Sequence, residues 1–326
     1  MLFRLQGVHG SRIEQKIAPE TAKMLLEHYF SDMTFDYQDY KDLDLLKYQT
    51  PEGGIAILPY SDADLKLSAK IAALFSDAFD NNALADYFYK IAQDPNETRE
   101  RSLIALCGLS ALGEPVLTEL KLLSEQEDLT VMEELYLSMA FLEIGDQPAA
   151  AQIIKTVIQE SGEDLESQLR IDNGQDQDDI LEATAMAAVV AAGTNVEEYN
   201  KLQAYLLENS TTDILLYIEQ LLFLKRALPL LPEESVSFSY KIEGKQTNVQ
   251  LKAKETLTLL LTPDKLSTIE FDNIKGRIGV TAVYNIVFDS NSESFSDEIK
   301  ITRSYQVSGK NTQSFDSNDL IKINIS

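Results

Sequence analysis

The spacing of apolar residues changes near residue 231, and that change divides the chain into a helical part and a β part. From about residue 12 to residue 230, apolar side chains recur every three or four positions, which is typical of amphipathic helices. From Val236 onward they alternate with polar residues, which is typical of half-buried strands. The sequence therefore predicts a multidomain α plus β chain in which helical hairpins precede small antiparallel β-domains.

Helix-stop signals divide the helical part into hairpins that recur roughly every 30 to 45 residues. The predicted breaks are Asp94-Pro95, Gly113-Glu114-Pro115, Gly145-Asp146-Gln147-Pro148 and Gly193-Thr194-Asn195. The segment from Ile180 to Ala192 has hardly any polar face, so we expect this helix to be buried on most sides. Such hairpins can form an open solenoid or an α/α toroid with inner and outer helix rings. A helix that is apolar all round suits an inner ring.

Alternating segments after residue 232 predict a small antiparallel β-sandwich. The expected strands cover residues 236–242, 249–253, 257–261, 269–271 and 280–288, with a turn at Gly244-Lys245. A linker rich in serine, asparagine and acidic residues, 289–297, leads to further strands at 299–305 and 320–326. The last strand stops as its pattern begins and would leave an unpaired edge, so we expect the sequence to be truncated.

Two short motifs lie near the N-terminus. The helix-opening motif is Gly10-Ser11-Arg12-Ile13-Glu14-Gln15, and the turn motif, Tyr48-Gln49-Thr50-Pro51-Glu52-Gly53-Gly54, precedes a helix expected near Leu65. Taken alone, Glu14 and Gln15 can be ordinary residues of a first helical turn, where acidic side chains complement the helix dipole.

These motifs, with the order of the helical and β parts, resemble the thioester-type region of the alpha-2-macroglobulin family, particularly its bacterial branch. That family has Gly-Cys-x-Glu-Gln at the helix start and a later Tyr-Gln-x-x-Gly-Gly turn. Here Ser11 stands for the glycine and Arg12 for the cysteine, whereas Glu14 and Gln15 keep the rest. A thioester needs a thiol that is both nucleophile and leaving group, and a guanidinium is neither. The resemblance thus implies a degenerate thioester position at Arg12, Glu14 and Gln15, with Tyr48, Gln49, Gly53 and Gly54 in the accompanying turn.

The resemblance also implies a division into three parts. Residues 1–231 would form an α/α-toroid thioester-type domain, 232–289 a CUB-like β-domain remnant, and 290–326 a linker with the beginning of a truncated macroglobulin-like β-sandwich. The implied function is that of a non-catalytic segment of a broad-spectrum protease trap, an endopeptidase inhibitor without covalent capture. Proteases would be partners of the intact protein, and no catalytic residue, metal or cofactor is expected.

Two alternatives use the same fold. The chain could be a toroid module that binds envelope proteins, or a toroid enzyme of the terpene-cyclase or carbohydrate-active type. Asp176-Gln177-Asp178-Asp179 matches the Asp-x-Asp-Asp pattern of class II terpene cyclases, but the chain has no tryptophan to line a carbocation cavity. These acids also precede a helix, where they are expected to act as caps. A calcium loop over residues 172–179 would lack the EF-hand spacing.

Charge and the scarcity of histidine and cysteine exclude several functions. The formal net charge is −25, which disfavours nucleic acid and anionic membrane surfaces as partners. The only histidines, His9 in the N-terminal lead and His28 in mid-helix, do not suggest a zinc site or a catalytic triad. The single cysteine, Cys107, lies in an apolar helical stretch and is expected to be buried.

Localisation depends on what precedes the chain. No apolar run is long enough to span a bilayer, and the segment after Met1 is too polar for a signal peptide. The resemblance implies an extracytoplasmic protein, in the periplasm or on the cell surface, with its export signal upstream. If Met1 were the true start, the sequence would indicate the cytoplasm.

Overall fold

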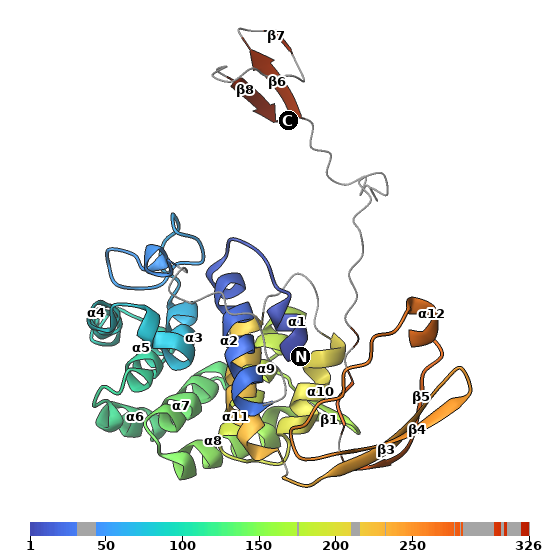
Figure 1. The fold of residues 1–326 in the computed structure, drawn as a ribbon. Helices are drawn as coiled ribbons and strands as arrows, with labels where there is room; N and C mark the ends of the chain where they lie inside the picture. Colours follow the sequence, from blue (N-terminus) through green and yellow to red (C-terminus); the bar gives the residue numbers. More distant parts are fainter. Residues whose placement is uncertain are drawn as a thin grey trace. The chain divides into compact units, whose positions relative to one another are not determined.

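The computed structural model describes residues 1–30, 44–174, 176–209, 216–231, 233–276, 278–280 and 282, and the backbone of three strands between residues 303 and 325. The chain forms two compact units, residues 1–281 and 282–326. The first contains the helices, and both contain small antiparallel sheets (Figure 1).

The predicted helical part is confirmed, and each of the four predicted breaks lies at a junction between two helices, two of them overlapping a helix end by one or two residues. The helices are α1 Leu2–Gln6, α2 Ile13–Tyr29, α3 Leu65–Phe75, α4 Asn81–Ala92, α5 Arg99–Ala111, α6 Leu117–Ser124, α7 Val131–Glu143, α8 Gln147–Ser161, α9 Gln177–Gly193, α10 Tyr199–Asn209 and α11 Tyr217–Ala227. Side-chain caps fix many of the starts, because a carboxylate or hydroxyl accepts a hydrogen bond from a first-turn N–H. The residues that do so are Asp64, Asp80, Thr98, Thr130, Asp146 and Asp176.

Helix α9 lies at the centre of the helical part, as its apolar surface predicts. Its side chains are buried almost without interruption from Ile180 to Ala192. It packs against α7, α8, α10 and α11, so that neighbours cover it on several sides (Figure 1). A helix with this composition is stable in water only inside such a shell.

A buried ionic cluster joins three of these helices. Lys70 of α3 contacts Glu182 of α9 at 2.8 Å and Glu219 of α11 at 2.6 Å. Lys66, which is more exposed, contacts the other oxygen of Glu182 at 3.1 Å. Burial would lower the pKa of Lys70, but the facing carboxylates outweigh it and raise that pKa well above its usual value. Burial would likewise raise the pKa of Glu182, yet Lys70 and Lys66 lower it to about 2.

The expectation of helices almost throughout residues 12–230 is wrong at one place. An antiparallel hairpin, β1 Gly162–Leu165 and β2 Gln168–Ile171, separates α8 from α9. Leu169 and Ile171 of β2 are buried, and the Ile171 N–H donates to Thr184 Oγ1 of α9 at 3.0 Å. Strands of four residues are too short for alternation to stand out in a charged sequence, which is why the pattern missed them.

The first predicted strand after the helices is confirmed as β3 Val236–Ile242. It lies between β4 Lys245–Leu251 and β5 Glu270–Lys275 in an antiparallel sheet of order β4-β3-β5. The predicted turn at Gly244 is also present. Glu243 and Gly244 both have positive φ, 49° and 81°, as a two-residue type I′ hairpin requires.

The strand expected over 257–261 is wrong. Residues 252–262 are irregular and lead into a short helix, α12 Pro263–Leu266. The Lys252 N–H donates to Glu255 Oε2 at 2.6 Å and Lys254 has a positive φ of 62°, so the chain turns as β4 ends. Leu257, one of the alternating leucines, is 42% exposed, so alternation alone did not secure a pairing partner.

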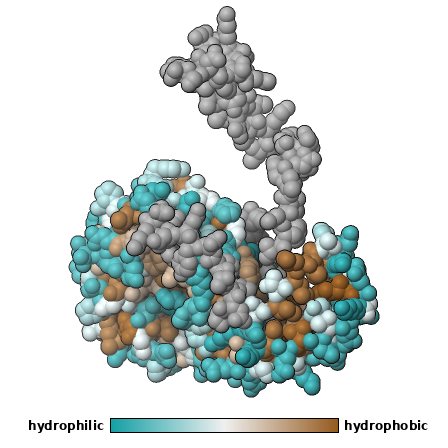
Figure 2. Space-filling model, in the orientation of Figure 1, coloured by the Kyte–Doolittle hydropathy of each residue, from teal (hydrophilic) through white to brown (hydrophobic). Residues whose placement is uncertain are grey.

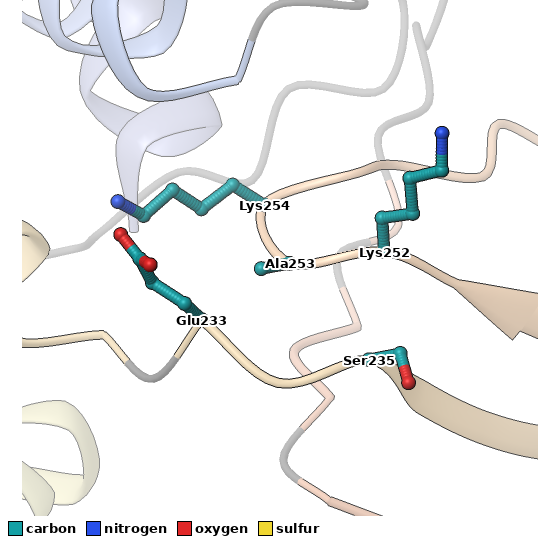
Figure 3. Close-up of a pocket in the computed structure, with 5 residues that line it drawn as sticks. All are labelled: Glu233, Ser235, Lys252, Ala253 and Lys254. Atoms are coloured by element: carbon teal, nitrogen blue, oxygen red, sulfur yellow. The ribbon is translucent and has the colours of Figure 1, made fainter.

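A shallow pocket of about 570 Å³ lies where the chain passes from helices to strands. Glu233, Ser235, Lys252, Ala253 and Lys254 line it. In Figure 3 the Lys254 ammonium and the Glu233 carboxylate point toward one another, whereas Lys252 points away from them. The Lys254 ammonium also lies 5.6 Å from the ring centre of Tyr29 at the end of α2. The contact of Lys254 with Tyr29 places the segment after β4 next to the end of α2.

The second unit contains β6 Arg303–Val307, β7 Lys310–Asn311 and β8 Ile321–Ile325, in the antiparallel order β7-β6-β8. Strands expected at 299–305 and 320–326 are therefore confirmed within the residues that are described. The expected linker 289–297 and most of the strand expected at 280–288 lie outside them. Among the described helices, none is long and apolar enough to cross a bilayer.

Cys107 is buried in α5 as expected, and burial raises the pKa of its thiol. His28 lies in the last turn of α2 rather than in mid-helix, with its ring edge-on to Tyr29.

Candidate functional site

Helix α2 starts at the helix-opening motif, as the sequence predicts. Arg12 is the N-cap residue, with extended backbone angles of φ −74° and ψ 148°. The Ile13 N–H donates to the Ile57 carbonyl at 3.0 Å, which fixes the helix start against the chain that follows the turn motif. The helix start is therefore held by a tertiary contact in addition to its own turn.

The Gln15 side chain folds back over the helix start. Its Oε1 accepts a hydrogen bond from the Arg12 backbone N–H at 3.2 Å, which is one half of a capping box. A Cβ atom at position 10 would lie only 1.8 Å from this oxygen, so Gly10 provides the space that the amide occupies. In this arrangement the Gln15 carboxamide serves as a helix cap.

Arg12 forms an ion pair with Glu14. Arg12 Nε donates to Glu14 Oε1 at 2.8 Å, and a terminal guanidinium nitrogen lies 2.6 Å from the same oxygen. The Arg12 side chain is 42% exposed, whereas that of Glu14 is only 5% exposed. The guanidinium thus partly neutralises a buried carboxylate, whose other oxygen has no hydrogen-bond partner within the described residues.

The turn motif contacts the helix-opening motif through Tyr48. The Tyr48 hydroxyl donates to the Ser11 carbonyl at 2.7 Å, and the ring is buried. Burial raises the pKa of Tyr48, and the nearby charge of Glu14 raises it further. Tyr48 is therefore held as a neutral hydrogen-bond donor beside residues 11–14.

Gln49 and the two glycines attach the same turn to α4. Gln49 Nε2 donates to the Gly53 and Asp80 carbonyls, each at 2.9 Å, and Gln49 Oε1 accepts from the Asp80 N–H at 2.9 Å. Gly53 has a φ of +97°, and a Cβ there would lie 2.0 Å from the Ala83 carbonyl oxygen. A Cβ on Gly54 would meet Ala63 and Tyr87 within 3 Å. Only glycine fits at both positions.

All the residues singled out in the two motifs thus belong to one assembly. The sequence did not predict two further residues of this assembly. The Asp80 backbone N–H and carbonyl form hydrogen bonds with the Gln49 side chain, and Ser68 Oγ accepts a hydrogen bond from the Ile55 N–H at 2.8 Å. Asp80 carries a detectable signal as a helix N-cap, but its pairing with a glutamine in a distant turn does not follow from local pattern.

The acidic segment before α9 contains a cap. Asp176 Oδ1 accepts from the Asp178 and Asp179 N–H groups at 3.0 and 3.1 Å, so the expected capping is confirmed for Asp176. Asp172 Oδ1 accepts from the Gly174 N–H at 2.9 Å. No group of three or more His, Cys, Asp or Glu residues that could hold a metal ion occurs in the part of the chain that the structure describes.

The sequence matches no protein-family model and no curated protein. Solved structures do match. A crystal structure of native Escherichia coli alpha-2-macroglobulin, from domain MG7 to the C-terminus, aligns with 99% of this chain at 14% identity and a TM-score of 0.53. The chain has the fold of the C-terminal region of bacterial alpha-2-macroglobulins.

Two further structures support the alpha-2-macroglobulin fold. Salmonella alpha-2-macroglobulin reacted with methylamine gives a TM-score of 0.57 at 14% identity, and the native E. coli protein solved by cryo-electron microscopy gives 0.53 at 16%. Both alignments cover 99% of this chain. The chain spans 56% of the MG7-to-C-terminus fragment and less than a quarter, 23% and 22%, of the two longer chains.

Replacing Tyr48 with phenylalanine tests the contact between the two motifs. We expect the free energy of unfolding to fall by about 1 kcal/mol, because a part-buried hydrogen bond from the buried Tyr48 side chain to the Ser11 carbonyl is lost. Urea unfolding measures the change, and Tyr60→Phe is the matched control because Tyr60 is 84% exposed. Equal stability of both variants would show that the hydroxyl does not hold the helix start.

Proposed function

We propose that this chain is the non-catalytic C-terminal segment of an alpha-2-macroglobulin-like protease trap that acts without covalent capture. The fold supports the family relation. The proposal that capture is not covalent rests on the start of α2, where Arg12 occupies the N-cap and the Gln15 amide caps the helix.

The chemistry follows from position 12. A thioester would require a thiol there to condense with the Gln15 side chain and release ammonia. Arg12 instead carries a guanidinium that stays protonated and is paired with Glu14. Gln15 then remains an amide, which nucleophiles attack far more slowly than a thioester. Capture by the intact protein would have to be steric or non-covalent.

The domain assignments are part of the same proposal. Residues 1–231 would be the α/α toroid, with the buried helix α9 in its inner ring. Residues 232–289 would be the CUB-like remnant and 290–326 the beginning of the terminal macroglobulin-like sandwich. Because the chain spans only part of the matched proteins, the bait segment that a protease cleaves would belong to a longer, extracytoplasmic protein.

Treatment with methylamine tests the absence of a thioester. We expect no change in mass of the native chain, because the Gln15 amide has no activated acyl group for the amine to attack. Intact-mass spectrometry with peptide mapping measures this, and Salmonella alpha-2-macroglobulin, which has been solved after reaction with methylamine, is the positive control. A methylamide at Gln15, with loss of one ammonia, would refute the proposal.

A second experiment tests the trap itself. The isolated chain should leave the activity of trypsin unchanged toward both a protein substrate and a small peptide substrate. The intact protein should slow hydrolysis of the protein substrate only, because a sterically enclosed protease still admits small substrates. Denaturing gels should show no covalent adduct with the protease. Equal protection of both substrates, or none, would favour the alternative of a module that binds envelope proteins.

A further inference from the structure

Helix α6 presents apolar side chains to solvent. Of its four leucines, only Leu120 is fully buried, whereas Leu117 and Leu122 are 41% and 62% exposed. Leu122 lies beside residues of α4 and α5. Figure 2 shows apolar (brown) atoms among hydrophilic ones on the surface of the helical part. A short helix that buries one leucine leaves an unusual amount of its apolar surface uncovered.

A groove of about 480 Å³ runs along this surface between α4, α5 and α6. Its walls are mostly apolar and comprise Ala92, Leu106, Leu109, Val116, Leu122 and Leu123. Polar side chains, among them Gln93, Ser102 and Gln126, also line it. A groove of this volume accommodates a few apolar side chains. A folded domain would need a much larger contact area for stable binding.

The charges around the groove are mainly negative. Arg99 is its only lining cation, and Glu133 and Asp128 already hold its guanidinium at 2.8 and 3.3 Å. Glu97 is paired with Arg101 at 2.6 Å, but Glu119 makes no ion pair within the described residues. The segment 117–130, which includes α6, carries four acidic residues against the single cation Lys121. A cationic partner is therefore favoured at this rim.

We propose that this groove binds a short linear segment of a partner protein, with two or three apolar side chains flanked by lysine or arginine. The apolar side chains occupy the space between Leu106, Val116 and Leu122, and the basic side chains face Glu119 and the acidic residues after α6. The same acidic rim repels anionic lipid, which distinguishes a protein segment from a membrane surface. This binding does not depend on the protease-trap function.

Fluorescence anisotropy with a labelled peptide of leucines flanked by lysines tests the proposal, using the full chain at physiological salt. Two reference peptides replace all the lysines with glutamate or all the leucines with serine. We expect saturable binding of the first peptide only. Leu122→Ser and Glu119→Lys should each weaken that binding about tenfold or more, since a buried leucine or a close charge pair contributes that much.

Matched variants separate groove binding from general attraction to an acidic protein. Leu117→Ser changes an exposed leucine of the same helix that does not line the groove, and Glu160→Lys makes the same charge change on α8. Both should bind the peptide as the native chain does. Equal losses in groove and control variants would overturn the proposal. So would a dimer of the native chain that Leu122→Ser dissociates, because the occupant would then be a second copy.

Discussion

Replacing Lys70 with alanine is expected to lower the free energy of unfolding by about 3–5 kcal/mol, the largest effect of any substitution considered for this chain. Lys70 contacts carboxylates from two different helices, Glu182 and Glu219, in a place where water has little access. Without the ammonium, two buried negative charges face each other with only the half-exposed Lys66 nearby. The cost arises from the stranded carboxylates rather than from the lost lysine.

Two further variants isolate this cause. Lys66→Ala removes the more exposed cation and should cost less than about 1 kcal/mol, as solvent-exposed ion pairs do. The double variant Lys70→Met, Glu219→Gln lacks one of the two unpaired carboxylates, so it should be more stable than Lys70→Met alone. Urea unfolding followed by circular dichroism measures all of them. If Lys70→Ala were no worse than Lys66→Ala, the cluster would not be acting as a buried ionic unit.

Acid should weaken the same cluster from the carboxylate side. The pKa of Glu182 is lowered to about 2 from an ordinary value of 4.5, so the folded state binds this proton less readily than the unfolded state. The stability that Glu182 contributes is complete above about pH 4.5 and is lost as the pH falls toward 2. Glu182→Gln should therefore flatten the pH dependence of unfolding in that interval, while leaving its shape above pH 6 unchanged.

The second large effect is expected at Gly53. Gly53→Ala should cost about 3 kcal/mol or more, because a Cβ would lie 2.0 Å from the Ala83 carbonyl and the φ of +97° is strained for alanine. The obstacle is the backbone of α4, which cannot move without disturbing the Gln49 bonds to Asp80. Loss of that packing should also expose the Ser11 contact of Tyr48.

Gly113 provides a matched control. It too has a left-handed φ, +81°, but a Cβ there would meet nothing within 4 Å. Gly113→Ala should therefore cost only the conformational term, about 1 kcal/mol. Thermal unfolding compares the two variants, and hydrogen exchange of the first turn of α2 reports on the motif contact. Similar losses at both glycines would mean that the close approach of the turn to α4 contributes nothing.

Sequence periodicity predicted the helical part well because the helices obey simple local rules. The break residues, the start of α3 at Leu65 and the burial of α9 all follow from composition within a few turns. The β1–β2 hairpin escaped because its strands have only four residues each, and the contact of Ile171 with Thr184 of α9 is not visible in a local pattern. The leucines of 257–261 misled because alternation describes one strand, whereas a strand needs a neighbour to pair with.

The residues of the candidate site could be predicted from the sequence, but the contacts between them could not. Arg12, Gln15 and the glycines of the turn could be selected from the printed sequence. The bonds that join them, from Tyr48 to Ser11 and from Gln49 to Asp80, link residues separated by 37 and 31 positions. The Lys70 cluster was likewise invisible, because its three helices come together only in the folded core.

The single thiol of this chain, Cys107 in α5, can report how often the helical core opens. Cys107 is 1% exposed and has no second thiol with which to exchange. A thiol reagent added to the folded protein can therefore react only with molecules whose core has transiently come apart. The rate at which the thiol is labelled therefore measures how often the core opens, and no extra cysteine has to be introduced.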